Sequence, residues 1–411
     1  MRLRLRARCP SVLGEFILKC LTYIIVAFTL CQRHICCVLC MVVVVCFLWW
    51  ASSDGEKCFG HELVKHVCQE YKEKNVAGDM CDSLCNEKEI DIGSCTSYSD
   101  ILQIFQNGDL VFSVQNDPFH SWLIDSIVEG TKLKRFVFDV DKHIQSELGL
   151  TDTSALMSRI IGDFDLNKDG NLNLGEAQSI WRLLKQPFFL AFYVFQDSTA
   201  VPHLNGSCGG ISIWHRPHLT TGDNLYHSKG PWPLSLFSSH AYRWTLPAWH
   251  KRAKVMLSLL ELVEEMYEKN GVRYHLCNVS GLTLYQLPNY EVTLSEEAMM
   301  LSSNQVAKRL ANISCQSSSD CTLTHQCQTV CELTTAQCTG KLIRPTLAYV
   351  CDIMQDYLLF DAPRALKSTL TRLIHRCQNM SMHLPKLDLL HSVVVVDIKT
   401  VLWNTLQYSH A

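Results

Sequence analysis

The distribution of cysteines constrains this chain more than any other feature of its sequence. Cysteine accounts for 21 of the 411 residues, which is far more than an ordinary cytosolic enzyme carries. Seven cysteines lie before residue 50 and fourteen lie after it, with an uncharged apolar run between the two groups. An even set of fourteen is typical of a disulfide framework, so we expect the chain beyond residue 52 to fold in an oxidising compartment.

The apolar run extends from Ile35 to Ala51 and predicts a membrane-spanning helix. Such a helix would measure roughly 25 Å, at the short end for a bilayer core. Trp49 and Trp50 stand where interfacial aromatic residues are common. Six basic residues and one acid precede the run, so the positive-inside rule keeps residues 1–34 in the cytosol. The alternative is a signal peptide cleaved at Ala51, and its long basic region argues against it.

The lumenal side of this topology carries features of a secreted domain. Four Asn-x-Ser/Thr sequons predict a glycoprotein: they begin at Asn205, Asn278, Asn312 and Asn379. Residues 54–95 hold five cysteines with little apolar material and predict a segment stapled by disulfides. Cys81 and Cys85 could form half of a zinc site, but no matching Cys or His pair follows, which favours disulfides.

The net charge limits the classes of partner. With 37 basic and 40 acidic residues the chain has a formal charge of −3, which argues against a nucleic-acid binder that works through bulk charge. The partners that we expect are therefore the membrane, through the N-terminal helix, and a lumenal protein that the sequence does not identify.

Hydrophobic periodicity gives a coarse secondary structure. Two strands are expected around the turn at 107–109, strands and a turn within 186–215, and a helix–loop–helix over 152–185. Beyond about residue 245 the pattern is mainly helical, with helices expected at 249–269, 295–311, 342–360, 362–377 and 387–408 and a cysteine cluster at 315–338.

The loop of the helix–loop–helix matches an EF-hand calcium loop. Residues 165–176 read Asp-Leu-Asn-Lys-Asp-Gly-Asn-Leu-Asn-Leu-Gly-Glu, with Gly170 at the sharp turn. Calcium requires six to eight oxygens, which such a loop supplies from positions 1, 3, 5, 7, 9 and 12. These positions hold Asp165, Asn167, Asp169, the backbone carbonyl of Asn171, Asn173 and Glu176. Only three of these residues are acids and one loop is visible, so we expect a dissociation constant of about 10⁻⁴–10⁻³ M.

Several stretches, taken in order, resemble the divergent protein kinase domain 1 family of cysteine-rich, endoplasmic-reticulum type II membrane proteins. They are the basic tail and anchor, the helix–loop–helix, and residues 77–85, 194–197, 206–209, 276–279, 315–338 and 400–403. The resemblance covers nearly the whole chain and implies an α+β, two-lobed kinase-like fold with the EF-hand inserted in the small lobe. The implied divisions are a tail at 1–34, an anchor at 35–51, a cysteine-rich segment at 52–99, a small lobe at 100–240 with the EF-hand at 152–187, and a helical large lobe at 241–411.

The same resemblance locates the positions that a kinase uses for phosphoryl transfer. A kinase needs a lysine on the phosphates, an aspartate that orients the acceptor hydroxyl, and an asparagine and a second aspartate that hold metal ions. Here these positions fall at Val114, Asn278, Thr283 and, as the nearest acid, Glu296. No glycine-rich phosphate loop precedes Val114. We therefore expect no catalytic residues and no ATP–Mg²⁺ cofactor.

Three functions remain open from the sequence. The first is a calcium-binding pseudokinase in the membrane of the endoplasmic reticulum that acts by binding or scaffolding. The second is an active, atypical, calcium-regulated lumenal kinase that uses Glu296 or another acid. The third is a disulfide-rich secreted protein, which would follow from cleavage at Ala51.

Overall fold

The computed structural model describes residues 60–85, 95–99, 102–107, 110–115, 133–186, 188–215, 248–278, 292–294 and 299–408. All of them belong to one compact unit that extends from Phe59 to Ala411. The predicted anchor at 35–51 lies outside the described residues, as do Thr283 and Glu296.

A small helical segment precedes the first sheet. It consists of α3 (Gly60–Lys72) and α4 (Cys81–Cys85). A disulfide between Cys68 and Cys85 joins the two helices, and a second one ties Cys81 to Cys208, 127 residues further along the chain. The preference for disulfides over zinc at this cysteine pair is confirmed. The long-range partner of Cys81 makes the segment part of the lobe that follows.

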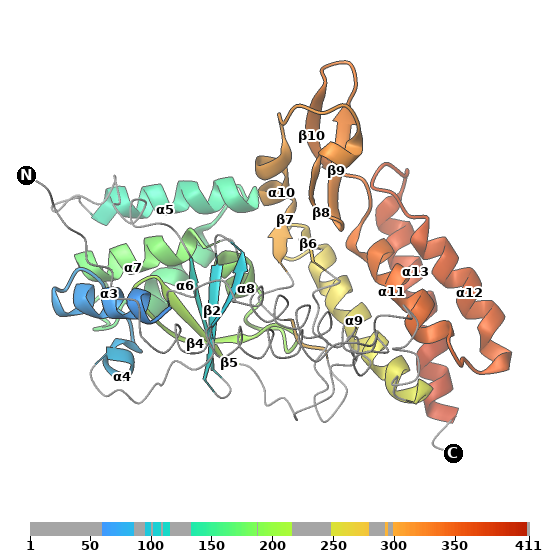
Figure 1. Ribbon diagram of the computed structural model, residues 1–411, viewed down its shortest axis with the longest axis horizontal. Helices are drawn as coiled ribbons and strands as arrows, with labels where there is room; N and C mark the ends of the chain where they lie inside the picture. The colour runs from blue at the N-terminus through green and yellow to red at the C-terminus, as the bar shows by residue number, and fades with distance from the viewer. Residues whose placement is uncertain are drawn as a thin grey trace, which may run out of the picture. The chain divides into compact units, whose positions relative to one another are not determined.

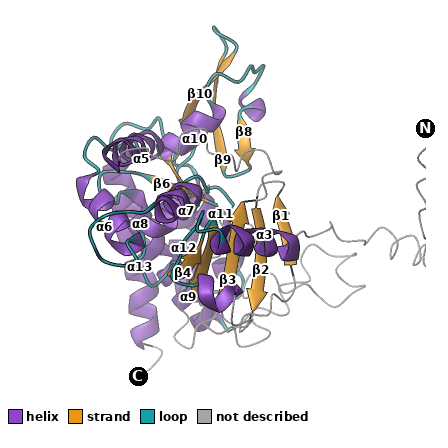
Figure 2. Ribbon diagram, turned by 90° about the vertical axis from the view of Figure 1, so that its left-hand side faces the viewer, coloured by secondary structure: helices purple, strands orange, loops and turns teal. Residues whose placement is uncertain are grey.

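A five-stranded antiparallel sheet forms the centre of the small lobe, with the strand order β1-β2-β3-β5-β4. Its strands are β1 (Cys95–Ser99), β2 (Leu102–Asn107), β3 (Leu110–Gln115), β4 (His203–Cys208) and β5 (Ile211–His215). Figure 2 shows β1, β2 and β3 side by side. The pairing of Asn107 with Leu110 closes the predicted hairpin, and Val111 pairs with Trp214 across the β3–β5 boundary. Strands far apart in sequence thus share one sheet.

Four helices complete the small lobe: α5 (Leu133–Leu148), α6 (Ser154–Phe164), α7 (Leu174–Leu184) and α8 (Phe189–Val194). Helices α6 and α7 confirm the predicted helix–loop–helix. Helix α8 corrects the expectation of strands throughout 186–215, because its six residues are all buried and helical. A short, continuous apolar run gives no periodicity that separates a buried strand from a buried helix. The helix places Phe189 against Tyr193, one turn later, with ring centroids 5.7 Å apart.

The large lobe is built mainly from helices, as expected. Its long helices are α9 (Trp249–Tyr267), α11 (Thr346–Leu359), α12 (Arg364–Gln378) and α13 (Leu387–Tyr408). Figure 1 shows them gathered on one side of this unit, and α13 packs against both α9 and α12. A disulfide between Cys351 and Cys377 joins α11 to α12. One continuous apolar core extends from these helices into the small lobe.

Two of the expected helices begin later than the sequence pattern suggests. Strand β6 (Tyr274–Leu276) pairs with β7 (Met300–Ser302), which occupies part of the range 295–311. Helix α10 (Ser303–Leu310) then starts where the Ser302 side chain accepts the Gln305 backbone N–H at 3.0 Å. Likewise α11 begins after Pro345, because proline is tolerated at a helix start and not inside one.

The second cysteine cluster forms a small sheet of its own. It contains the 3₁₀ turn η4 (Ser318–Asp320) and the strands β8 (Thr322–Thr324), β9 (Cys327–Glu332) and β10 (Gln337–Leu342). Disulfides Cys315–Cys331 and Cys321–Cys338 fill its interior, where a sheet this small has little apolar material. With these bonds, twelve of the fourteen later cysteines are paired within the described residues.

One helix among the described residues is long and apolar enough to cross a membrane, and it is α13 over Leu387–Gln407. Its inner face contributes Val394, Ile398 and Leu402 to the core of the large lobe. Core helices of folded domains meet the same criteria of length and composition, so these properties of α13 do not indicate a membrane span.

Candidate metal centre and kinase-like positions

The loop between α6 and α7 begins at a buried carboxylate. Asp165 ends α6, where its backbone N–H donates to the carbonyl of Ile161 at 2.9 Å, and its residue surface is 5% exposed. One carboxylate oxygen, Oδ2, accepts the backbone N–H of Gly170 at 2.8 Å. Gly170 has a φ of +78°, which a residue with a side chain rarely adopts. The glycine therefore lets the chain turn back over position 1 of the loop.

The exposed middle of the loop is organised by its own side chains. Asn167 accepts the backbone N–H of Asp169 at 3.1 Å, and Asp169 accepts that of Asn171 at 2.7 Å. The Asn167 amide also donates to the Asp169 carboxylate at 3.0 Å. These short-range bonds hold the side chains of positions 3 and 5 next to each other. The side-chain amide of Asn171 donates to the carbonyl of Asp169 at 3.4 Å.

The end of the loop is the start of α7. Asn173 caps the helix by accepting the Glu176 N–H at 2.9 Å, and Glu176 accepts the Asn173 N–H at 2.8 Å. The other oxygen of Glu176 accepts the backbone N–H of Leu166 at 3.2 Å. Glu176 is only 2% exposed, so position 12 is drawn inward against the residue that follows position 1. The six predicted positions therefore lie in one continuous turn of chain.

One atom of this loop lacks a partner. Oδ1 of Asp165 is fully buried and makes no hydrogen bond within the described part of the chain. A buried carboxylate oxygen without a hydrogen bond or counter-charge costs several kcal/mol of solvation. The oxygen belongs to position 1 of the loop, which ligates the cation in every EF-hand. The donor set fits calcium, because it is made of carboxylates, amide oxygens and a carbonyl.

The helix–loop–helix is fastened to α3 and to the segment that follows it. Arg182 on α7 makes a bidentate ion pair with Glu70 at 2.7 and 2.9 Å. Ser179 accepts the backbone N–H of Ala77 at 2.9 Å. Gly175 faces the carbonyl of Lys74, which a Cβ would approach to 3.0 Å. This contact was not predicted. The one feature of the sequence that indicates it is the small residue at position 11 of the loop, Gly175.

The structure describes two of the four kinase-like positions. Val114 lies in β3, which confirms the strand predicted over 110–115. Asn278 is half-buried and lies two residues after the end of β6. Thr283 and Glu296 lie outside the described residues, so their roles stay predictions.

A disulfide whose pairing was not predicted holds the chain just before Asn278. Cys277 is fully buried and forms a disulfide with Cys327 on β9. Its backbone N–H donates to the carbonyl of Met299 at 2.9 Å, and its carbonyl accepts the hydroxyl of Thr324. This position is therefore fixed to the small cysteine-rich sheet.

A buried histidine lies two residues before Cys277 in the chain. His275 on β6 is 5% exposed, and its Nε2 lies 2.8 Å from the Ser303 hydroxyl. Burial, aided by the nearby charge of Arg273, lowers the pKa of His275 to about 4. The imidazole is neutral near pH 7, and we assign it to the packing of β6 against α10.

Fold and comparison together define the class of the protein as kinase-like. One protein-family model, described as the protein-kinase domain of FAM69, matches residues 180–380. A second one, described as the N-terminal cysteine-rich endoplasmic-reticulum segment of FAM69, matches residues 23–117. The chain belongs to the FAM69 family of divergent protein kinases, which confirms the resemblance inferred from its motifs.

The two matched segments share one sheet of the structure. Strands β1, β2 and β3 lie in the N-terminal match and β4 and β5 lie in the kinase-domain match, yet all five form one sheet. Residues 118–179, which include α6 and the whole calcium-like loop, lie between the matched segments.

Proposed function

We propose that this protein is a calcium-binding pseudokinase of the endoplasmic-reticulum lumen that acts by binding or scaffolding. Membership of the FAM69 family supplies the kinase-like class, and the description of its N-terminal segment supplies the compartment. Calcium binding, loss of catalysis and the type II anchor are the parts that this proposal adds.

The unpartnered Oδ1 of Asp165 carries the calcium proposal. Asp165 and Glu176 place two buried carboxylates at the opposite ends of one short loop, where a cation would compensate their charge. The exposed side chains of Asn167, Asp169 and Asn173 complete the oxygen set. The position of the loop between the two family matches supports an EF-hand inserted into the small lobe.

Calcium titration of the full-length protein in detergent tests this site. We expect one site per chain with a dissociation constant of about 10⁻⁴–10⁻³ M by calorimetry. Calcium at ten times that constant should stabilise the fold by about 1.4 kcal/mol. Glu176→Gln removes a buried ligand and should weaken binding at least tenfold, whereas the exposed Glu268→Gln should not change it. Identical heats for wild type and Glu176→Gln would refute the site.

The pseudokinase proposal rests on the chemistry of the residues at the kinase-like positions. Valine at 114 offers no charge to the phosphates, and the amide of Asn278 cannot accept a proton as a carboxylate does. The disulfide at Cys277 supports the same proposal, since it fixes the chain before Asn278 to the small cysteine-rich sheet. Such rigidity suits a scaffold that presents a constant surface.

Thermal unfolding with nucleotide tests the loss of catalysis. ATP with Mg²⁺ or Mn²⁺ should leave the midpoint unchanged, while calcium raises it in the same preparation and so proves that the protein is folded. A ligand at 100 times its dissociation constant would add about 2.7 kcal/mol, which is easily detected. Saturable stabilisation by ATP would overturn the proposal in favour of the atypical kinase.

The membrane topology has its own test. A type II anchor at 35–51 places every sequon in the lumen, and Asn312 and Asn379 are exposed in the folded domain. Endoglycosidase treatment should therefore increase the gel mobility of the protein from cells, and Asn312→Gln with Asn379→Gln should reduce that change. Mobility that is unaffected by the enzyme would count against the lumenal placement.

A further inference from the structure

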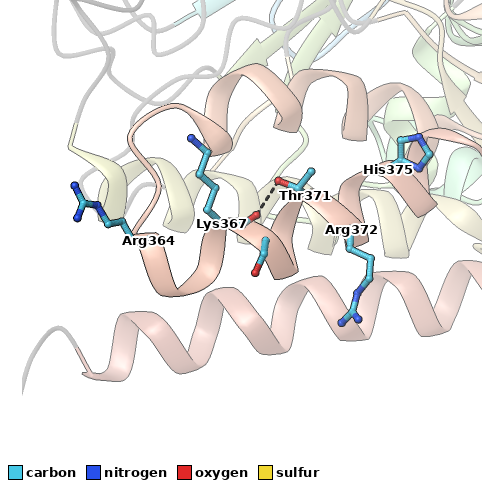
Figure 3. A pocket seen from close by; sticks show the side chains of 6 residues that line it. Arg364, Lys367, Thr371, Arg372 and His375 are labelled. Carbon is cyan, nitrogen blue, oxygen red and sulfur yellow. Dashed lines mark hydrogen bonds between the residues drawn. The ribbon is translucent and has the colours of Figure 1, made fainter.

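The outer face of α12 is unusually basic. The helix contains no acidic residue, and five basic side chains lie on its exposed side: Arg364, Lys367, Arg372, His375 and Arg376. The first four, together with Ser368 and Thr371, line a shallow hollow. Figure 3 shows the labelled basic side chains spread along the helix and pointing to either side of its axis. This concentration is local, because the chain as a whole carries a formal charge of −3.

Three of these cations lack acidic partners within the described residues, whereas several other cations of the large lobe have one. Arg273 pairs with Asp388 at 2.7 Å. Arg344 pairs with Asp352 at 2.9 Å, and Lys399 pairs with Glu264 at the same distance. In contrast, no acid within the described residues forms an ion pair with Arg364, Lys367 or Arg372. At the end of the row, Arg376 lies 4.0 Å from Asp397, so its charge is only weakly compensated.

The hollow offers hydrogen bonds beside the charges. Thr371 donates its hydroxyl to the Lys367 carbonyl at 2.7 Å, which leaves its oxygen free to accept. Guanidinium groups bind the paired oxygens of an oxyanion through two parallel N–H donors. The lining contains no large apolar side chain that could receive the anchor of a peptide partner. Recognition at this face would depend on charge and hydroxyl groups.

The shape of the charged row indicates a linear ligand. Helical rise places Arg364 and His375 about 16 Å apart along an open surface. A chain with repeated anionic groups and hydroxyls could follow this row. This step rests on the lumenal placement proposed above, because in the secretory pathway polyanions of this kind are sulfated polysaccharides rather than nucleic acids. We propose that the outer face of α12 binds a sulfated polysaccharide.

Heparin is the probe that tests this site. Full-length protein in detergent should bind immobilised heparin and elute earlier as salt rises, because exposed charge pairs are screened. The triple substitution Arg364→Ala, Lys367→Ala and Arg372→Ala should weaken heparin binding about tenfold, the sum of three exposed pairs. All three side chains are exposed, so the thermal midpoint should not change.

A matched control removes the same charge elsewhere. Lys72→Ala, Arg135→Ala and Lys341→Ala are exposed substitutions outside α12 and should preserve heparin binding. An equal loss in this control would show that only net charge matters and would overturn the site. The proposal also fails if wild type does not bind heparin, or if desulfated heparin or polyglutamate binds as tightly. The last result would assign the face to an acidic peptide.

Discussion

Replacement of Gly78 by alanine should destabilise the protein by about 3 kcal/mol or more, the largest effect that we expect from a single methyl group. The new Cβ would lie 2.7 Å from the Cα of Cys208 and closer still to the carbonyl oxygen of Ser207. Both obstacles are backbone atoms of β4, so no rotamer change can relieve the overlap. The Cys81–Cys208 disulfide stands next to this contact and prevents the two segments from separating.

Chemical denaturation followed by circular dichroism measures this effect, and Gly162→Ala provides its control. Gly162 lies within α6, and a Cβ there would meet nothing within 4 Å. Alanine in an open helical position should stabilise the protein by about 0.5–1 kcal/mol. The two substitutions are chemically the same, so their opposite signs isolate the close approach at Gly78. A Gly78→Ala midpoint equal to that of wild type would contradict the contact.

Removal of the Cys81–Cys208 disulfide should have the second large effect. The bond closes a loop of 127 residues, and the loop-entropy relation assigns it about 5 kcal/mol of unfolded-state constraint. It also joins α4 to the edge strand of the sheet, so its loss removes a covalent link between the N-terminal segment and the sheet. We expect the double variant Cys81→Ala, Cys208→Ala to unfold at a much lower denaturant concentration than wild type.

A second disulfide in the same segment gives the comparison. Cys68–Cys85 closes a loop of only 17 residues, for which the same relation gives about 3 kcal/mol. The variant Cys68→Ala, Cys85→Ala should therefore lose less stability than the variant that lacks the long-range bond. If the variant without Cys68–Cys85 lost more stability than the variant without Cys81–Cys208, the role of Cys81–Cys208 as the main fastening of this segment would be wrong.

Local sequence patterns were sufficient for much of the fold. The strand pair around 107–110 and the helices at 249–267 and 387–408 carry clear periodicity, and the helix–loop–helix is marked by its ligand spacing and Gly170. The pattern failed at Phe189–Val194, where burial on every side removes the polar positions that distinguish helix from strand. It also missed β7, because three residues are too few to show alternation.

For the candidate site as well, the sequence predicts one part and the tertiary structure decides the other. Spacing alone named all six oxygen donors of the loop, since an EF-hand is a contiguous segment. Whether Asp165 is buried and lacks a partner depends on what packs around it. Distant residues take part in this packing, since Glu70 and Ala77 bind α7 at the other end of the loop. The kinase-like positions are scattered over more than 180 residues, so their mutual arrangement cannot be read from spacing.

By itself, the sequence determined that most later cysteines would form disulfides, that one loop carries oxygen donors at the spacing of an EF-hand, and that the chain is a divergent kinase relative. Composition and contiguous motifs carry this information, because they depend on neighbours along the chain. Only the tertiary structure decided that Cys81 pairs with Cys208, that β3 lies beside β5, and that three cations of α12 have no acidic partner within the described residues. Those facts depend on which distant segments meet, and the packing of the shared core sets those meetings.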